Sequence, residues 1–156
     1  MLNAKVINYL ERFSLFYRYK LFQILGYLGL LPMAAPLFFF DDPLAVRFFL
    51  TYSLAILCFV SGALWAKSFQ LAGSEQNQNK ILIISNVSVL IAFLSVMCLD
   101  QIVLIVLASL FGVVLFVEKR FLEAEDLTDG YLKMRVIVST IVIILHILGF
   151  VILIVV

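Results

Sequence analysis

Long apolar runs separated by short polar stretches make up the chain after residue 20. A bilayer core of about 30 Å needs about 20 helical residues to cross it, and five of the runs approach that length. Asp100 and Gln101 divide the third run from the fourth, which together would be far too long for one crossing. We therefore predict an all-α, polytopic membrane bundle of five transmembrane helices that forms a single domain over residues 1–156. The predicted spans cover residues 21–40, 47–66, 81–99, 102–117 and 136–156.

Small and polar residues form a stripe along one face of the second predicted span, which is otherwise apolar. In lipid, small residues let helix backbones approach closely, so such a stripe favours packing against other membrane helices. The third predicted span has a similar face. The stripe of the second span consists of Thr51, Ala55, Cys58, Gly62 and Trp65, and that of the third consists of Ser85, Ser88, Ala92 and Ser95.

The remaining segments are more polar or contain proline. Pro32 and Pro36 each remove a helical hydrogen bond and are expected to bend the outer half of the first span. Residues 73–79 are predicted to form a polar loop, and residues 118–132 a solvated, partly helical loop. Before the first span, residues 2–19 fit a short amphipathic helix at the membrane interface. A cytoplasmic extension of the first span would explain the same pattern.

Composition and charge set the class and the orientation of the protein. Of its residues, 65% are hydrophobic and only 13% are charged, which excludes an ordinary soluble domain, where roughly 45–50% are apolar and about 25% charged. Ten of the 11 Lys and Arg residues fall on one side of the predicted membrane, and only Arg47 falls on the other. The positive-inside rule then predicts a cytoplasmic N-terminus and a C-terminus outside. The first 20 residues lack the compact apolar stretch of a signal peptide, so we expect no cleaved signal.

His146 is the only histidine and lies near the middle of the fifth span, on one helical face with Arg135. Because polar groups are costly inside a bilayer, it is a candidate proton-relay group or axial haem ligand. The alternative is an interhelical hydrogen bond to a serine or to a backbone carbonyl. One histidine cannot build a metal cluster, and Cys58 and Cys98 both lie in apolar runs, where small packing residues are expected. We therefore predict no metal site, no cofactor and no disulfide.

Trp65 and Arg135 are both expected near the cytoplasmic interface. One interpretation is that Gly62, Trp65 and Arg135 form the floor of a pocket for an anionic or amphipathic ligand, with Tyr131 and His146 nearby on the face of the fifth span. The alternative is that Trp65 sits in the headgroup region, as tryptophan commonly does, and that Arg135 anchors its span by reaching to the interface. The sequence shows no catalytic signature and no phosphate-binding loop, so we predict that the protein is not an enzyme.

Three short motifs resemble a known family. They are Leu25-Gly26-Tyr27-Leu28-Gly29-Leu30-Leu31-Pro32, then Tyr52-Ser53-Leu54-Ala55-Ile56-Leu57 with Ser61-Gly62-Ala63-Leu64-Trp65-Ala66, and finally Tyr131-Leu132-Lys133-Met134-Arg135 followed by Ser139-Thr140. Their order is similar to that in the DUF3429 family of small five-helix membrane proteins, which includes the animal mitochondrial transmembrane protein 69. The family pattern has a histidine where this chain has Leu64, so no role of that histidine carries over. The resemblance implies the architecture and no biochemical activity.

Two functions remain open at this point. The faces of small residues favour a non-enzymatic accessory or assembly factor that packs against other membrane proteins in the lipid bilayer. The alternative is a bundle that binds a small ligand or lipid, or conducts a small solute, with Trp65, Arg135 and His146 lining the site. Basic residues merely flank the spans, which argues against nucleic-acid binding. The lack of an Arg- and Ser-rich presequence favours a bacterial cytoplasmic (inner) membrane, and the mitochondrial relative keeps the mitochondrial inner membrane as the alternative.

Overall fold

The computed structural model describes residues 20–21, 23–69, 75–98, 101–122 and 129–155, and nearly all of these are helical. The interfacial helix predicted at residues 2–19 lies outside the described residues. The apolar segment Gln23–Phe39, which we call the first segment, contains α2 (Leu31–Ala34) and the 3₁₀ helix η1 (Ala35–Phe39). It is followed by α3 (Pro43–Ser68), α4 (Glu75–Cys98), α5 (Val103–Leu122) and α6 (Asp129–Val155).

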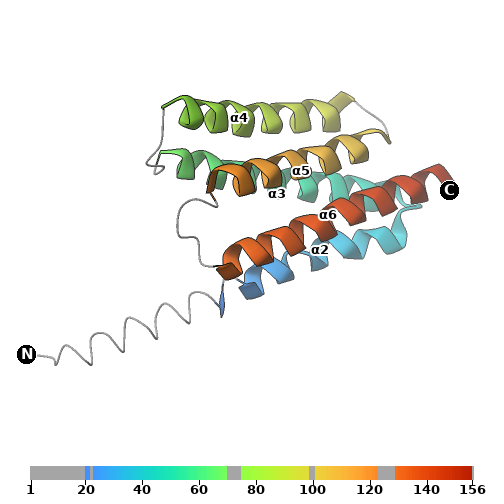
Figure 1. Ribbon diagram of the computed structural model, residues 1–156. Coiled ribbons are helices and arrows are strands. Elements are labelled where there is room, and N and C mark those ends of the chain that lie inside the picture. Colours follow the sequence, from blue (N-terminus) through green and yellow to red (C-terminus); the bar gives the residue numbers. More distant parts are fainter. Residues whose placement is uncertain (1–19, 22, 70–74, 99–100, 123–128, 156) are drawn as a thin grey trace, which may run out of the picture.

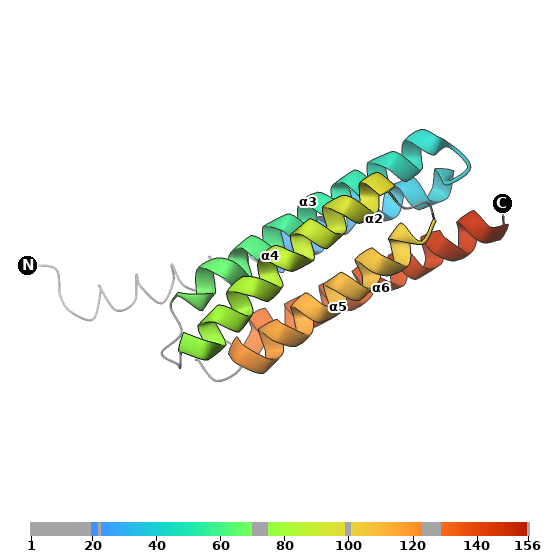
Figure 2. The ribbon, with the colours of Figure 1, turned by 90° about the horizontal axis from the view of Figure 1, so that it is seen from above.

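The long helices run alongside one another in two layers. In perpendicular views, α2, α3 and α4 form one layer, and α5 and α6 form the other (Figures 1 and 2). Within the layers α3 packs on α4 and α5 packs on α6, and across the layers α5 also contacts both α3 and α4. The first segment lies on the side of α3 opposite to α4 and contacts α3 and α6 through α2 (Figure 1). This arrangement places the first segment, α3 and α6 around one side of the bundle.

The first segment is not one continuous helix. Its α-helix is interrupted by a turn at Gly29 and Leu30, where the Leu30 N–H donates to the carbonyl three residues earlier (3.1 Å). Pro32 and Pro36 lie in the first turns of α2 and η1, where a missing N–H does little harm. The Tyr52 hydroxyl of α3 donates to the Gly29 carbonyl (3.0 Å). The expected distortion is therefore present as a break into short helices, and a neighbouring helix satisfies a backbone group at the break.

Both α3 and α4 begin earlier than the predicted spans. Pro43 opens α3, and the Asp42 carboxylate caps it by accepting a hydrogen bond from the Leu44 N–H (2.9 Å). The first helical residue of α4 is Glu75, so residues 75–79, which we assigned to a loop, are helical. An acidic residue in the first turn is stabilised by the helix dipole, and no glycine or proline follows in α4 to interrupt it. The loop prediction was wrong for these residues.

The described residues of the predicted charged loop at 118–132 are helical. Helix α5 continues to Leu122, and α6 begins at Asp129. The expectation of a partly helical segment is thus confirmed for the described residues, while residues 123–128 lie outside them. As a consequence, Glu118 and Tyr131 are held on helices.

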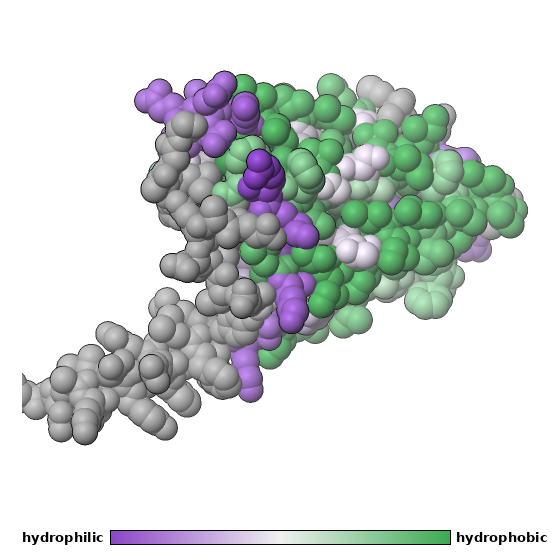
Figure 3. All heavy atoms as spheres, in the orientation of Figure 1, coloured by the Kyte–Doolittle hydropathy of each residue, from purple (hydrophilic) through white to green (hydrophobic). Residues whose placement is uncertain are grey.

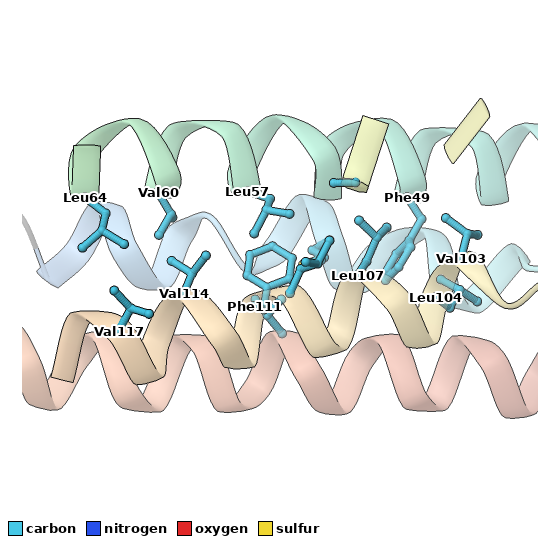
Figure 4. Close-up of a cluster of buried hydrophobic side chains, with 14 of the residues drawn as sticks. Phe49, Leu57, Val60, Leu64, Val103, Leu104, Leu107, Phe111, Val114 and Val117 are labelled. Carbon is cyan, nitrogen blue, oxygen red and sulfur yellow. The ribbon is translucent and has the colours of Figure 1, made fainter. Parts of the chain in front are cut away.

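The hydrophobic core lies between α3 and α5. Figure 4 shows a row of side chains from α3 facing a row from α5. One row of buried α5 residues recurs at alternating intervals of three and four, which is the spacing of helices that interlock along one seam. This row consists of Leu104, Leu107, Phe111 and Val114, and it faces Phe49, Leu57, Val60 and Leu64 of α3.

The two small-residue faces lie in different environments. The α4 face of Ser85, Ser88, Ala92 and Ser95 is buried inside the bundle, as expected of a packing face. The α3 stripe from Thr51 to Trp65 is exposed or half-buried. The buried side of α3 instead carries its core residues and three serines, because that side faces α5 and α6. Most of the stripe therefore lies outside the core, and Cys58, Gly62 and Trp65 line a recess next to α4.

The outer surface is apolar along most of its length, and hydrophilic residues gather at the end where α4 and α6 begin (Figure 3). Helices α3, α4 and α6 are each long and apolar enough to cross a membrane. The apolar stretch of α5 ends at Val117, before the charged residues Glu118, Lys119 and Arg120. The first segment is shorter than α3, α4 and α6. By its helix hydropathy this is a multi-pass membrane protein of the all-α class.

Candidate functional site

A cavity of about 270 Å³ lies between the first segment, α3 and α6. Most of its wall is apolar, and Gly26 and Gly29 add no side chain to fill it. Its polar lining residues are Tyr52, Glu118, Tyr131 and Arg135. The cavity therefore combines an apolar body with charged groups in one part of its wall.

The first segment and α6 approach closely beside this cavity. A Cβ atom at Gly26 would lie 2.6 Å from Met134 Sδ, so any larger residue there would displace the Met134 side chain. Leu25 and Phe59, which also line the cavity, are 59% and 78% exposed. The cavity thus opens between the first segment and α3, toward the surface that faces lipid.

Three side chains from α3 and α6 surround the carboxylate of Glu118 of α5, and we call the four residues the charged cluster. Glu118 is only 4% exposed. Arg135 of α6 donates from Nε to Glu118 Oε2, and its Nη2 lies at the same distance from that oxygen, 2.9 Å in each case. The Tyr131 hydroxyl donates to Oε1 (3.2 Å), and Lys67 Nζ of α3 lies 3.5 Å from Oε1.

The charged cluster contains two cations and one anion. The Arg135 side chain is 11% exposed, so its charge lies mostly outside water. Lys67 is more accessible, and its Nζ lies 4.4 Å from the centroid of the Tyr131 ring, which adds a cation–π contact. Glu118 can balance only one of the two positive charges. The cluster therefore leaves a positive excess beside the wall of the cavity.

Sequence reasoning missed Glu118. The apolar run of α5 ends at Val117, and we assigned the following glutamate to a solvated loop. However, Glu118 continues the buried spacing of Leu107, Phe111 and Val114 by one further interval of four residues. That spacing is the signal that could have placed it on the inner face of α5.

His146 lies apart from the cavity lining, in the middle of the bundle, and is 0% exposed. Its Nδ1 lies 2.8 Å from the Val142 carbonyl and must donate to it, so Nε2 accepts from the Ser53 hydroxyl of α3 at 2.6 Å. Phe49 and Phe111 pack on the ring, with centroids 5.0 and 5.5 Å away. Both ring nitrogens are thus engaged, by a serine and by a backbone carbonyl, and neither is directed at a ligand site.

Gly62 and Trp65 lie on a different side of α3 from Arg135 and Tyr131. They line a recess between α3 and α4 together with Ser61, Ser85 and Asn86. A Cβ atom at Gly62 would meet nothing within 4 Å, and Trp65 is 44% exposed. The Ser61 hydroxyl is buried and has no hydrogen-bond partner among the described residues. The predicted pocket residues are therefore divided: Tyr131 and Arg135 meet at the cavity, Gly62 and Trp65 line the recess, and His146 lies in the core.

The fold and the site define a class, namely small all-α membrane proteins with a lateral cavity beside a buried charged cluster. Within the described residues, no three His, Cys, Asp or Glu side chains come together as a possible metal site. The family described as "Protein of unknown function (DUF3429)" matches residues 19–151, and the chain belongs to this family. The resemblance seen in the sequence is thereby confirmed. No curated protein and no solved structure matches the chain.

Proposed function

We propose that the chain crosses the membrane five times, with the first segment and α5 as the spans beyond the three long apolar helices. The N-terminus lies in the cytoplasm and the C-terminus lies outside. This proposal is supported by the distribution of Lys and Arg, because among the described Lys and Arg residues only Arg47 falls at the end of the bundle where α3 begins. A bacterial cytoplasmic membrane is the proposed location, and a mitochondrial inner membrane is the alternative.

The function that the geometry supports best is binding of an amphipathic small molecule, without catalysis. The observation behind it is the cavity, which has an apolar body and the charged cluster in its wall, as ligand sites commonly do. Its volume of about 270 Å³ exceeds that of an engineered cavity of about 150 Å³ that binds benzene. Tyr131 and Arg135 each donate a hydrogen bond to Glu118, which supports a binding role for these residues over proton transfer.

Filling the cavity tests this function. Ala63 of α3 lines the cavity, so Ala63→Phe is expected to place a ring inside it and to abolish ligand occupancy. Ala55 is exposed on the same helix, so Ala55→Phe is the matched control and should retain the ligand. The measurement is native mass spectrometry of protein released from gently solubilised membranes, read for bound small molecules. A wild-type protein that never carries a bound molecule, or equal occupancy in both variants, would contradict the proposal.

An accessory role is the second candidate, and the exposed stripe of α3 favours it. Most of this stripe is exposed, and a Cβ atom at Gly62 would meet nothing within 4 Å. A small-residue face with open space beside it is suited to close approach by a helix of another membrane protein.

If the stripe binds such a helix, Gly62→Leu should release a partner that co-purifies with the wild type in mild detergent. Ser109→Leu is the control, because Ser109 is a small residue exposed on α5. Quantitative mass spectrometry of the purified samples measures the partner. Recovery of a partner-free wild type, under conditions that keep other membrane complexes intact, counts against the accessory role.

A further inference from the structure

The charged cluster also restricts the kind of ligand that the cavity can hold. Lys67 and Arg135 supply two positive charges against the single carboxylate of Glu118. Charges that are mostly removed from water require a counter-charge close by, because solvation no longer stabilises them. We infer that the ligand is an anionic single-chain amphiphile, whose carboxylate or phosphate head lies at Arg135 and Lys67 and whose tail occupies the cavity. This inference rests on the proposed function of the cavity.

In the charged cluster, hydrogen-bond donors outnumber the acceptors that the described side chains supply. Tyr131 and Tyr52 already donate, to Glu118 and to the Gly29 carbonyl. Lys67 has three N–H groups, and within the described part of the chain its Nζ forms an ion pair with Glu118 at 3.5 Å but no hydrogen bond. Arg135 uses Nε and Nη2 for Glu118, which leaves its Nη1 group for another partner. The head that complements this set accepts hydrogen bonds and carries negative charge.

The shape of the cavity favours a single apolar chain. Ile56 and Val60 of α3 face Val138 and Val142 of α6 across it, so the walls away from the charged cluster are apolar. The volume is less than twice that of a cavity that holds one benzene ring, which is too small for two acyl chains. The opening beside Leu25 and Phe59 faces the bilayer, from which such a molecule would enter.

The chain itself contains another source of negative charge. Glu123, Glu125 and Asp126 follow Glu118 in sequence and lie outside the described residues. If one of them balanced the excess charge, replacing all three with Gln, Gln and Asn would increase binding of an added anion. The inference predicts no such increase, because the site is open to an anionic head in the wild type.

The test compares three probes that share one alkyl chain: monododecyl phosphate, dodecanol and dodecyltrimethylammonium. Full-length protein is placed in nanodiscs of zwitterionic phosphatidylcholine, and bound probe is counted by native mass spectrometry. The phosphate is expected to bind about tenfold or more tightly than the alcohol, because hydrogen bonds to a charged group are the stronger ones. The trimethylammonium probe is expected to bind most weakly. Inorganic phosphate should not compete at the same concentration, since it has no tail.

Lys67→Met is the informative variant, because it removes the positive excess and leaves the Glu118–Arg135 pair intact. It is expected to reduce the preference for the phosphate over the alcohol by about fivefold or more, with little effect on the alcohol itself. Equal binding of all three probes to the wild type would overturn the inference and leave the cavity function standing. Binding of none of them, or equal binding to Ala63→Phe, would overturn the cavity function itself. An anion preference that survives Lys67→Met unchanged, or that appears only after neutralising the three acidic residues, would also overturn the inference.

Discussion

Two buried polar sites in this bundle are alike in burial and differ in how fully their hydrogen-bonding groups and charges are satisfied. His146 and Glu118 are both single polar residues on the inner face of a helix, and each bonds to another helix. At His146 both ring nitrogens are engaged and aromatic rings fill the remaining space. At Glu118 the described side chains supply two cations against one carboxylate, and a cavity lies beside them. Burial of a polar residue in a membrane protein therefore does not by itself indicate a site. Spare hydrogen-bonding capacity next to open space does.

The largest expected effect is a loss of folding stability when the carboxylate of Glu118 is removed. Glu118→Ala removes the only carboxylate of the charged cluster and leaves Arg135 mostly buried without its partner. Losing one partner of a buried ion pair costs about 3–5 kcal/mol, and we expect a loss of this order in the free energy of unfolding in mixed micelles. Glu75→Ala is the control, because Glu75 is exposed in the first turn of α4.

The control should change stability by no more than about 0.5 kcal/mol, as surface substitutions usually do. Similar losses for the two alanine variants would mean that solvent or another group compensates Arg135, and the contrast with His146 would disappear.

A smaller effect is expected at the satisfied site. His146→Phe keeps a ring between Phe49 and Phe111 but leaves the Ser53 hydroxyl without its partner, which should cost about 1–2 kcal/mol. Adding Ser53→Ala removes that hydroxyl, and the double variant should recover most of the loss, because replacing both partners by apolar groups is nearly neutral. Unfolding in mixed micelles measures all three proteins.

Occupancy of the cavity should be the same in His146→Phe as in the wild type, since His146 does not line it. A large loss of ligand in this variant, at unchanged stability, would show that His146 belongs to the functional site and that it does not differ from Glu118 in this respect.

Much of the fold could be predicted from the sequence, because apolar runs of sufficient length dictate helices and breaks between them dictate turns. The face of α6 that carries Arg135 and His146 was also predicted from their spacing, and the structure turns it inward, with Ser139, His146 and Gly149 all buried. The inner face of α3 was not predicted. In lipid the outer face of a helix is as apolar as the inner one, so hydrophobicity does not tell which face turns inward. Ser53 and Ser61 mark the inner face of α3 better than its small-residue stripe does.

The site was only partly predictable for the same reason. Tyr131 and Arg135 stand one turn apart on a single helix, so their proximity follows from spacing alone. Their association with Glu118 depends on how far α5 extends beyond its apolar run, which hydropathy does not report. The separation of Trp65 from Arg135 depends on the rotation of α3 about its own axis. Both features are set by packing between helices that are distant in the sequence.

The partners of Glu118 in the charged cluster are synthesised at different times. Lys67, Glu118 and Arg135 belong to α3, α5 and α6, so a chain emerging from the ribosome reaches Glu118 with only the lysine available to it. The arginine arrives with the last span. Until then the carboxylate lacks the partner that it holds at 2.9 Å in the finished bundle. A chain that ends before α6 therefore lacks Arg135, and among the charged side chains of the cluster Glu118 then has only Lys67 beside it.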